Sequence, residues 1–343
     1  MHRKTDLPLR RDRAAGVLLG AAAGDALGVP YEFAPRLGGH EEPRMKGGGL
    51  GPYAPGEYSD DTQMAVCLAE TALHFPDVRG GEARRYAAEA WLRWYREGAT
   101  DIGNQTASVL AAAAPLSGTG AVAEKMAGTA LDRYRSGIPS AGNGSLMRTA
   151  PLALAYLGDP GALAEAAWDY SAMTHADPLA CEACVLWCEG VRHAVVHGTF
   201  DGVRAGLDLI GAEGRDRWRT WLDEAEAEPP GRFSPNGFVV PALQAAWSAV
   251  RRTPVPEGES SSGHLRLALE AAVRAGDDTD TVAAIAGALL GACWGASAVP
   301  ARWRRAVHGW PGHRAEDLAA MGVRIAFGTG RNEAGDPPRS SDA

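Results

Sequence analysis

Two short runs of aspartate and hydroxyl side chains carry the strongest chemical signal in this chain. One is Gly276-Asp277-Asp278-Thr279-Asp280-Thr281, and the other is Ser59-Asp60-Asp61-Thr62. Each run directly precedes an apolar segment with the composition of a buried helix. Adjacent carboxylates repel one another unless a cation or solvent compensates their charge. Because oxygen-only ligand sets favour hard cations such as Mg²⁺, Mn²⁺ or Ca²⁺, the two runs predict one shared cation site where two helix starts converge.

The same runs could instead be acidic caps on two separate helices. A capping aspartate, serine or threonine uses its side-chain oxygen to accept a hydrogen bond from a free backbone N–H. Side chains at positions i and i+2 of a helix face different ways, so Asp278 and Asp280 converge only if they lie in a turn at the helix start. Four carboxylates could neutralise two divalent ions, which lie roughly 3.5–4 Å apart in two-metal sites. The spacing alone leaves the cap and the metal site both open.

The composition restricts the classes of protein that fit. With 343 residues the chain can bury the core of one large domain or two ordinary ones. It has 34 basic and 42 acidic residues and a net charge of -8. This balance argues against a nucleic-acid-binding protein held by a general basic field.

The five cysteines do not have the spacing of a disulfide framework. Cys181, Cys184 and Cys188 stand at i, i+3 and i+7, which places them on one face of a helix. They could pack there as small apolar residues, or bind zinc or an iron–sulfur cluster with His175 as a fourth ligand. No second Cys-x-x-Cys completes a zinc site, so we favour packing, and we expect a reducing, cytoplasmic location.

The N-terminus resembles a signal peptide only superficially. Residues 1–13 are basic and residues 14–24 are apolar, but Asp6 and Asp12 interrupt the charged region and the apolar run is rich in glycine and alanine. No later segment has the roughly 20 strongly apolar residues that a membrane span requires. We therefore expect no membrane partner.

Helical patterns dominate the chain and strand signals are nearly absent. We predict helices over residues 13–28, 62–75, 82–97, 104–114, 121–135, 145–156, 162–171, 178–197, 202–210, 218–227, 241–251, 265–275, 282–294 and 315–327. Residues 33–58 form a long Gly/Pro-rich connection, a type of loop that is usually functional or disordered. We predict one all-α domain over residues 13–330, with a flexible segment at 1–12 and a disordered tail at 331–343.

Six stretches in this order resemble the ADP-ribosylglycohydrolase family. They are Gly24-Asp25-Ala26-Leu27-Gly28 with Tyr31-Glu32, then Ser59-Asp60-Asp61-Thr62, Asp101-Ile102-Gly103-Asn104, Gly142-Asn143-Gly144-Ser145-Leu146-Met147-Arg148, Thr174-His175, and Gly276-Asp277-Asp278-Thr279-Asp280-Thr281. The matches span positions 13 to about 328, nearly the whole chain. Six ordered motifs are a far more specific signal than any one of them.

The resemblance implies a single-domain, largely orthogonal multi-helix bundle that binds two Mg²⁺ or Mn²⁺ ions. It implies cleavage of the bond between ADP-ribose and a modified group, often the guanidinium of arginine, by attack of an activated water at the anomeric carbon of the ribose. The metal ligands carried over by the motifs are Ser59 (or Thr62), Asp60, Asp61, Asp278, Asp280 and Thr281. Ser59 stands where family members commonly have threonine, so a hydroxyl is retained. Asp277 is assigned a supporting or capping role.

The same resemblance assigns catalytic roles to Glu32, on a flap over the metals, and to Asp101. It places Asn104, Ser140, Gly142, Asn143, Gly144, Ser145 and His175 at the ADP-ribose. Each has a plainer alternative: Asp101 as the N-cap of the next helix, Gly-Asn-Gly as a common turn, and His175 as a structural hydrogen-bonding residue. Residues 139–143 lack the aromatic residue that the serine-specific animal branch carries, which favours the bacterial branch.

The expected partner is an ADP-ribosylated protein or a small ADP-ribose conjugate, and a nucleic acid enters only as a modified substrate. Two other functions stay open. The chain could be a non-catalytic ADP-ribose-binding or structural protein of the same fold, or a two-metal phosphohydrolase that releases AMP.

Overall fold

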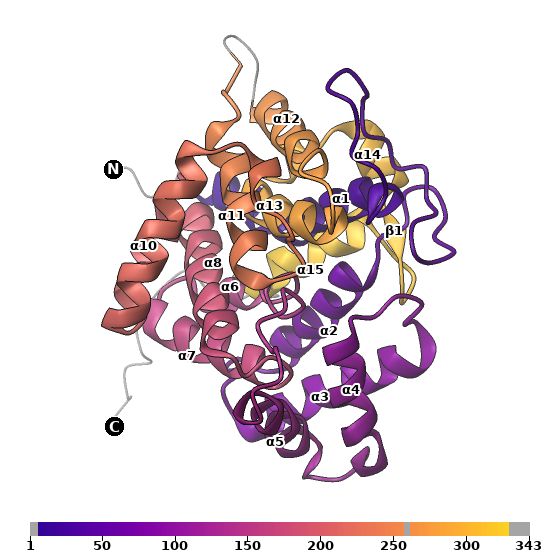
Figure 1. Cartoon of the computed structure of the whole chain (residues 1–343), viewed down its shortest axis with the longest axis vertical. Helices are drawn as coiled ribbons and strands as arrows, with labels where there is room; N and C mark the ends of the chain where they lie inside the picture. Colours follow the sequence, from indigo (N-terminus) through magenta and orange to yellow (C-terminus); the bar gives the residue numbers. More distant parts are fainter. Residues whose placement is uncertain (1–5, 257–260, 329–343) are drawn as a thin grey trace, which may run out of the picture.

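The computed structural model describes residues 6–256 and 261–328, and over these residues the protein is built from helices (Figure 1). The α-helices are α1 (Leu7–Gly28), α2 (Asp60–His74), α3 (Gly81–Glu97), α4 (Asn104–Ala113), α5 (Val122–Arg135), α6 (Leu152–Ala155), α7 (Pro160–Ala172), α8 (Pro178–His197), α9 (Gly202–Ala205), α10 (Ala212–Ala227), α11 (Val239–Arg252), α12 (Ser261–Val273), α13 (Thr279–Trp294), α14 (Ala301–Ala306) and α15 (Ala315–Phe327). Strands β1 (His308–Gly309) and β2 (His313–Arg314) pair as a small antiparallel hairpin. The predicted all-α class is confirmed.

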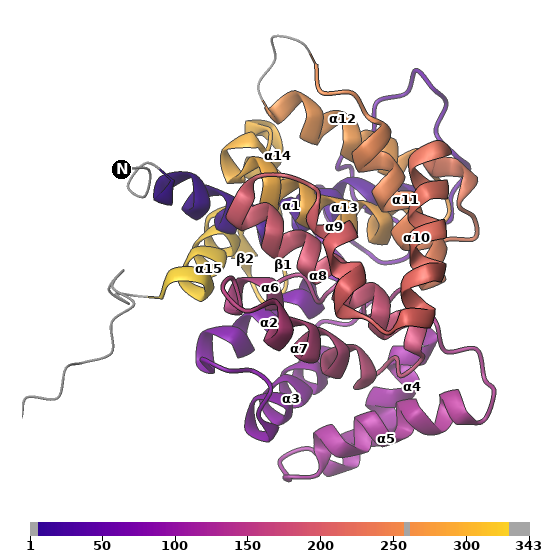
Figure 2. The same ribbon diagram turned by 90° about the vertical axis from the view of Figure 1, so that its left-hand side faces the viewer.

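Helices α1 and α13 cross the middle of the molecule side by side, in backbone contact along a seam of small residues (Figures 1 and 2). On α1 the seam residues Gly16, Gly20 and Gly24 recur every fourth position. A Cβ on Gly20 would collide with the carbonyl oxygen of Gly287, and one on Gly24 with that of Ala283. Only glycine permits so close an approach. The seam sets the C-terminal end of α1 against the first turn of α13.

The other helices surround this central pair. Helices α3, α4 and α5 lie together at the lower end of the molecule in both views, while α11 and α12 pack on α13 (Figures 1 and 2). Helix α8 packs against α7, α9 and α13, and its three cysteines are buried and unpaired. The cysteine face therefore packs as predicted, in the manner of small apolar residues.

Some predicted boundaries were wrong. Residues 145–151 form turns, so the helix predicted over 145–156 is limited to α6. Helix α1 begins at Leu7, within the segment predicted to be flexible, and neither α14 nor the hairpin was predicted. The tail at 331–343 lies outside the described residues.

The first helix is also long and apolar enough to cross a membrane by length and composition. That stretch, Leu7–Tyr31, is 94% buried inside the protein over its apolar window, as the core helix of a folded domain is. The apolar character of α1 is therefore accounted for by the seam with α13 and by contacts with α2, α8 and α15.

Candidate active site

Four helix starts converge on one acidic cavity of about 510 Å³. They are the first turns of α2, α4, α11 and α13, joined by Glu32 and by the loop around Gly142. Among the described residues that line the cavity, none is a lysine or an arginine. Six of them carry a carboxyl group: Glu32, Asp60, Asp61, Asp101, Asp278 and Asp280.

Asp25, on α1, holds the start of α2 in place through hydrogen bonds. Its carboxylate accepts hydrogen bonds from the backbone N–H groups of Ser59 (2.8 Å) and Thr62 (3.0 Å), and from their hydroxyls (2.8 and 2.6 Å). Four such bonds satisfy a buried carboxylate, and they orient the helix start. Burial raises the pKa of Asp25 to about 6, although the bonds from Thr62 and Ser59 oppose this rise.

Neither acidic run acts as an ordinary helix cap. Ser59 is the N-cap residue of α2 and Asp278 that of α13, yet neither side chain makes a capping hydrogen bond to its own helix. The Ser59 hydroxyl faces Asp25, Asp61 (3.1 Å) and Asp280 (3.4 Å) instead. The Asp278 carboxylate accepts a bond from the side-chain amide of Asn143 at 2.8 Å. The capping interpretation of the two runs is therefore wrong for both helices.

The carboxylates form two clusters that could each hold a metal ion. Asp25, Asp61 and Asp280 form one, and Glu32, Asp278 and Asp280 form the other, with the ligand atoms of each within 4.8 Å of one another. Both groups are oxygen-only, the donor set of hard cations. Asp61 Oδ1 is buried and has no hydrogen-bond partner in the described part of the chain, as expected of an oxygen that a cation would satisfy. The residues present therefore fit a divalent-cation site.

The electrostatics of the cavity agree with this fit. Burial raises the pKa of Asp60, Asp61 and Asp280 well above the ordinary aspartate value, and neighbouring carboxylates raise it further. The pKa of Asp278 is also raised, mainly by burial, while the hydrogen bond from Asn143 opposes the rise. Buried like charges at this density are costly unless cations or protons compensate them.

Glu32 and Asp101 face each other at the mouth of the cavity. Burial raises the pKa of Glu32 to about 9, followed by the charges of Asp101, Asp278 and Asp60. Burial also raises the pKa of Asp101, although a side-chain hydrogen bond with Glu32 opposes that rise and at the same time favours the protonated form of Glu32. The N-cap of α4 is Gly103, so the interpretation of Asp101 as that cap is wrong.

Asp277 lies outside the cavity and supports its edge. Its side chain accepts a hydrogen bond from Ser234 and lies 3.8 Å from Arg36. Its backbone has a φ of 59°, in the left-handed region, and its carbonyl accepts a bond from the N–H of Phe33 at 2.7 Å. Asp277 thereby connects the start of α13 to the segment that carries Glu32.

The residues assigned to ADP-ribose fall into two groups. Asn104, Gly142, Asn143, Gly144 and His175 line the cavity. Asn143 also uses its side chain on Asp278 and its backbone N–H on the Gly237 carbonyl.

Ser140 and Ser145 do not line the cavity. The Ser140 hydroxyl donates to the Ile138 carbonyl, and the Ser145 hydroxyl lies 2.8 Å from the Ser171 hydroxyl. The side chains of these two serines hold the loop rather than face a ligand.

Sequence reasoning missed several residues of this site, among them a buried aspartate and three exposed apolar side chains. Asp25 lies in the last turn of the apolar helix α1, and no local pattern indicates that it holds the start of α2. Phe33, Leu50 and Phe238 are largely exposed and line the cavity, forming an apolar rim around the carboxylates. Exposed large apolar residues that gather at one cavity are typical of a binding site.

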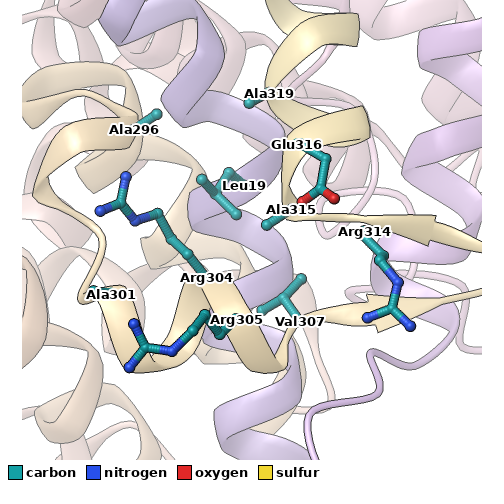
Figure 3. Close-up of a pocket in the computed structure, with 10 residues that line it drawn as sticks. All are labelled: Leu19, Ala296, Ala301, Arg304, Arg305, Val307, Arg314, Ala315, Glu316 and Ala319. Carbon is teal, nitrogen blue, oxygen red and sulfur yellow. The ribbon is translucent and has the colours of Figure 1, made fainter.

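A second cavity of about 510 Å³ lies between α1, α14, β2 and α15 (Figure 3). It is lined by the exposed residues Arg304, Arg305 and Arg314, whose guanidinium groups point in different directions. It contains none of the predicted site residues. The acidic cavity is therefore the candidate active site.

The fold and this site define the class of the protein. A profile of the ADP-ribosylglycohydrolase family matches residues 6–333, so the chain belongs to that family and is a hydrolase of glycosyl bonds.

Individual relatives extend this result. The ADP-ribosylarginine hydrolase Tri1 of Pseudomonas putida (strain GB-1) is 33% identical over 316 residues, covering 88% of this chain and 76% of that protein. The ADP-ribosyl-[dinitrogen reductase] glycohydrolase of Rhodospirillum rubrum is 28% identical over 308 residues, with 86% and 90% covered. A solved structure, an ADP-ribosylglycohydrolase-related protein complex, has a TM-score of 0.71 and 31% identity, covering 94% of this chain and 99% of that chain.

Proposed function

We propose that this protein removes ADP-ribose from a modified arginine side chain with the help of two divalent cations, Mg²⁺ or Mn²⁺. The observation that carries the proposal is the convergence of six carboxyl groups on one cavity in which Asp61 Oδ1 has no partner among the described residues. Two relatives named as ADP-ribosylarginine hydrolases support the arginine linkage. An acidic cavity also suits a substrate whose leaving group is a guanidine.

Asp61, Asp278 and Asp280 would hold the cations, with Asp60, Thr281 and Glu32 alongside them at the cavity wall. Ser59 could contribute its hydroxyl oxygen as a further ligand. That hydroxyl already faces the carboxylates of Asp25, Asp61 and Asp280. When bound, divalent cations lower the pKa of water and so supply a nucleophile near neutral pH.

The protein's own groups would then manage the substrate and the protons. Water adds to the anomeric carbon of the ribose, the bond from that carbon to the guanidine nitrogen breaks, and the guanidine leaves with a proton. Asp101, whose ionised form is favoured by its hydrogen bond with Glu32, would accept a proton from the attacking water and return it to the departing guanidine nitrogen, while Glu32 would close the mouth of the cavity. The first turn of α4 and the backbone of Gly142 and Gly144 would offer N–H groups to the diphosphate.

A panel of defined substrates tests the proposal. ADP-ribose linked to arginine, serine, a nucleic-acid base or acetate is incubated with Mg²⁺, Mn²⁺ or a chelator, and mass spectrometry identifies the products. We expect intact ADP-ribose and unmodified arginine, formed only with metal. AMP would instead establish a phosphohydrolase, and binding of ADP-ribose without release from any conjugate would establish a non-catalytic binder.

We also propose a cytoplasmic location, which the five buried, unpaired cysteines support. Fractionation of cells that express the protein from its own gene, followed by immunoblotting, tests this. Recovery in a secreted or membrane fraction would overturn it.

A further inference from the structure

Arg148 is a fully buried arginine next to the active site with an unusual set of partners. Its guanidinium lies 4.2 Å from the centre of the Trp91 ring, and Nη1 lies 3.7 Å from Met64 Sδ. None of the ion pairs found within residues 6–256 and 261–328 includes Arg148. Removing a guanidinium from water without a carboxylate partner is costly, and burial lowers the pKa of Arg148 to about 10. Among the described residues, the one hydrogen bond that its guanidinium makes to an oxygen atom goes to Thr174 Oγ1, at 2.6 Å.

The bond from Arg148 determines which hydrogen-bonding roles remain for the Thr174 hydroxyl. Arginine is only a donor, so Thr174 Oγ1 accepts from Arg148. The same hydroxyl oxygen lies 2.7 Å from Nδ1 of the adjacent His175. A hydroxyl has a single hydrogen to donate. If Nδ1 carried a hydrogen, the Thr174 hydroxyl would accept twice and its own buried hydrogen would have no acceptor in the described part of the chain, so the contact favours donation by Thr174 to an unprotonated Nδ1.

The other nitrogen of His175 faces the cavity. The side chain is 2% exposed and lines the cavity wall, where Nε2 is close to the Gly142 and Gly144 backbone. A Cβ on either glycine would lie 3.2–3.3 Å from Nε2, so the missing side chains are what let the ring approach this loop. In the described chain, Nε2 forms no hydrogen bond that would occupy it.

The loop that carries the ring is itself held from both sides. Gln105 donates to the Thr174 carbonyl at 2.8 Å, and Ser171 donates to the His175 carbonyl at 3.2 Å. Burial, followed by the charges of Arg148 and Arg133, lowers the pKa of His175 to about 3. The ring is therefore neutral at physiological pH and has one N–H, which the Thr174 contact places on Nε2.

We propose that Arg148 and Thr174 are positioning residues that hold His175 as its Nε2–H tautomer and so present one fixed hydrogen-bond donor to an acceptor oxygen of the bound ADP-ribose. The choice of ADP-ribose rests on the proposed function, whereas the tautomer does not. A fixed Nε2–H favours ligands that place an acceptor oxygen next to it and disfavours ligands that place a hydrogen-bond donor there.

Nitrogen NMR tests the tautomer directly. Histidine is labelled with ¹⁵N in the full chain, long-range ¹H–¹⁵N spectra distinguish protonated from unprotonated ring nitrogens, and the His175→Gln variant identifies the His175 signals. We expect a hydrogen on Nε2 and none on Nδ1 at neutral pH. A hydrogen on Nδ1 in the parent protein overturns the proposal without any need for a second variant.

A matched pair of variants tests the two positioning residues. Thr174→Val keeps the shape but cannot donate, so the Nδ1–H tautomer becomes populated, whereas Thr174→Ser retains the Nε2–H form. ADP-ribose affinity by calorimetry should weaken about tenfold in Thr174→Val, the loss of roughly one hydrogen bond, and stay within about threefold of the parent in Thr174→Ser. The KM for hydrolysis should rise by a similar factor with a smaller change in kcat. Thermal unfolding confirms that both variants fold.

The outcomes separate this proposal from the proposed function. An unchanged tautomer in folded Thr174→Val overturns the role of Thr174. A shifted tautomer in a protein that hydrolyses no ADP-ribosyl conjugate overturns the proposed function and leaves the positioning role standing. A shifted tautomer with unaltered ADP-ribose affinity overturns the assignment of ADP-ribose as the acceptor.

Discussion

Helices α7 and α8 begin much as α2 and α13 do, with an aspartate or serine just ahead of the helix, yet the two pairs use these residues differently. Asp159 caps α7 by accepting a bond from the Ala162 N–H, and Asp177 caps α8 through the Leu179 N–H. Ser59 and Asp278 make no such bonds to α2 and α13.

The difference shows how a functional carboxylate can be distinguished from a structural one. A cap satisfies its own helix and costs little because it stays near solvent. At α2 and α13 the side chains of Asp61, Asp278 and Asp280 are buried, lie close to one another and leave Asp61 Oδ1 without a partner in the described structure. That arrangement opposes folding without a ligand, so it indicates a site rather than a cap.

The sharpest test of this comparison is Asp280→Asn, since Asp280 belongs to both carboxylate clusters. Hydrolysis of ADP-ribosyl-arginine at saturating Mg²⁺ or Mn²⁺ should fall by about 10³-fold, the scale for losing a group that stabilises the transition state. In chelator the variant should unfold at the same temperature as the parent or higher, because a buried acid has been removed. Activity assays and calorimetric unfolding measure the two effects. Full activity in the variant would show that Asp280 is structural.

A second test uses the pH dependence of the metal-free protein. The pKa of Glu32 is raised from 4.5 to about 9 and that of Asp25 from 3.8 to about 6. For each group, at any pH between its unfolded and its folded pKa, the folded state binds more protons than the unfolded state. The free energy of unfolding therefore falls as pH rises through this range. We expect the unfolding temperature in chelator to drop by several degrees from pH 5 to pH 9.

Two controls accompany that measurement. Glu32→Gln should flatten the slope, because the amide does not titrate in this range. Added Mg²⁺ or Mn²⁺ should stabilise the protein more strongly at high pH, since the cations replace the protons. A metal-free unfolding temperature that rises from pH 5 to pH 9 would contradict the assignment of these groups as buried and crowded.

The smallest expected effect belongs to the ordinary caps. Asp159→Ala should destabilise the protein by about 1 kcal/mol, the typical value for a lost N-cap, and leave hydrolysis within experimental error of the parent. Denaturant unfolding and the standard assay measure this. A large loss of activity in a folded Asp159→Ala variant would remove the distinction between the two kinds of helix start.

Much of the fold could be predicted from the sequence because helix periodicity is a local property. The predicted starts of α2 and α13, at 62 and 282, lie within three residues of Asp60 and Thr279. Residues 145–151 were misassigned because their apolar residues suit a helix, whereas Ser145 and Arg148 use their side chains on Ser171 and Thr174 from another part of the chain. Tertiary contacts there override the local pattern.

The site could be predicted only in part, for the same reason. Composition indicated a hard-cation cluster at two helix starts, and the family resemblance supplied ADP-ribose. Asp25 was recognised only as part of a family motif, and its role could not be predicted because its partners lie 34 and 37 positions away along the chain. The orientation of His175 also depends on Arg148, whose burial is visible only in three dimensions.

The glycine seam between α1 and α13 has a consequence for how the protein tolerates change. A core built on side chains can accept a new methyl group by rotating a neighbour, but backbone in contact with backbone has no rotamer to change. A Cβ on Gly28 would meet the Asp280 backbone itself. Most positions of the hydrophobic core can therefore accept substitutions over evolutionary time. Along the glycine seam, one added carbon would instead force α1 and α13 apart next to the candidate active site.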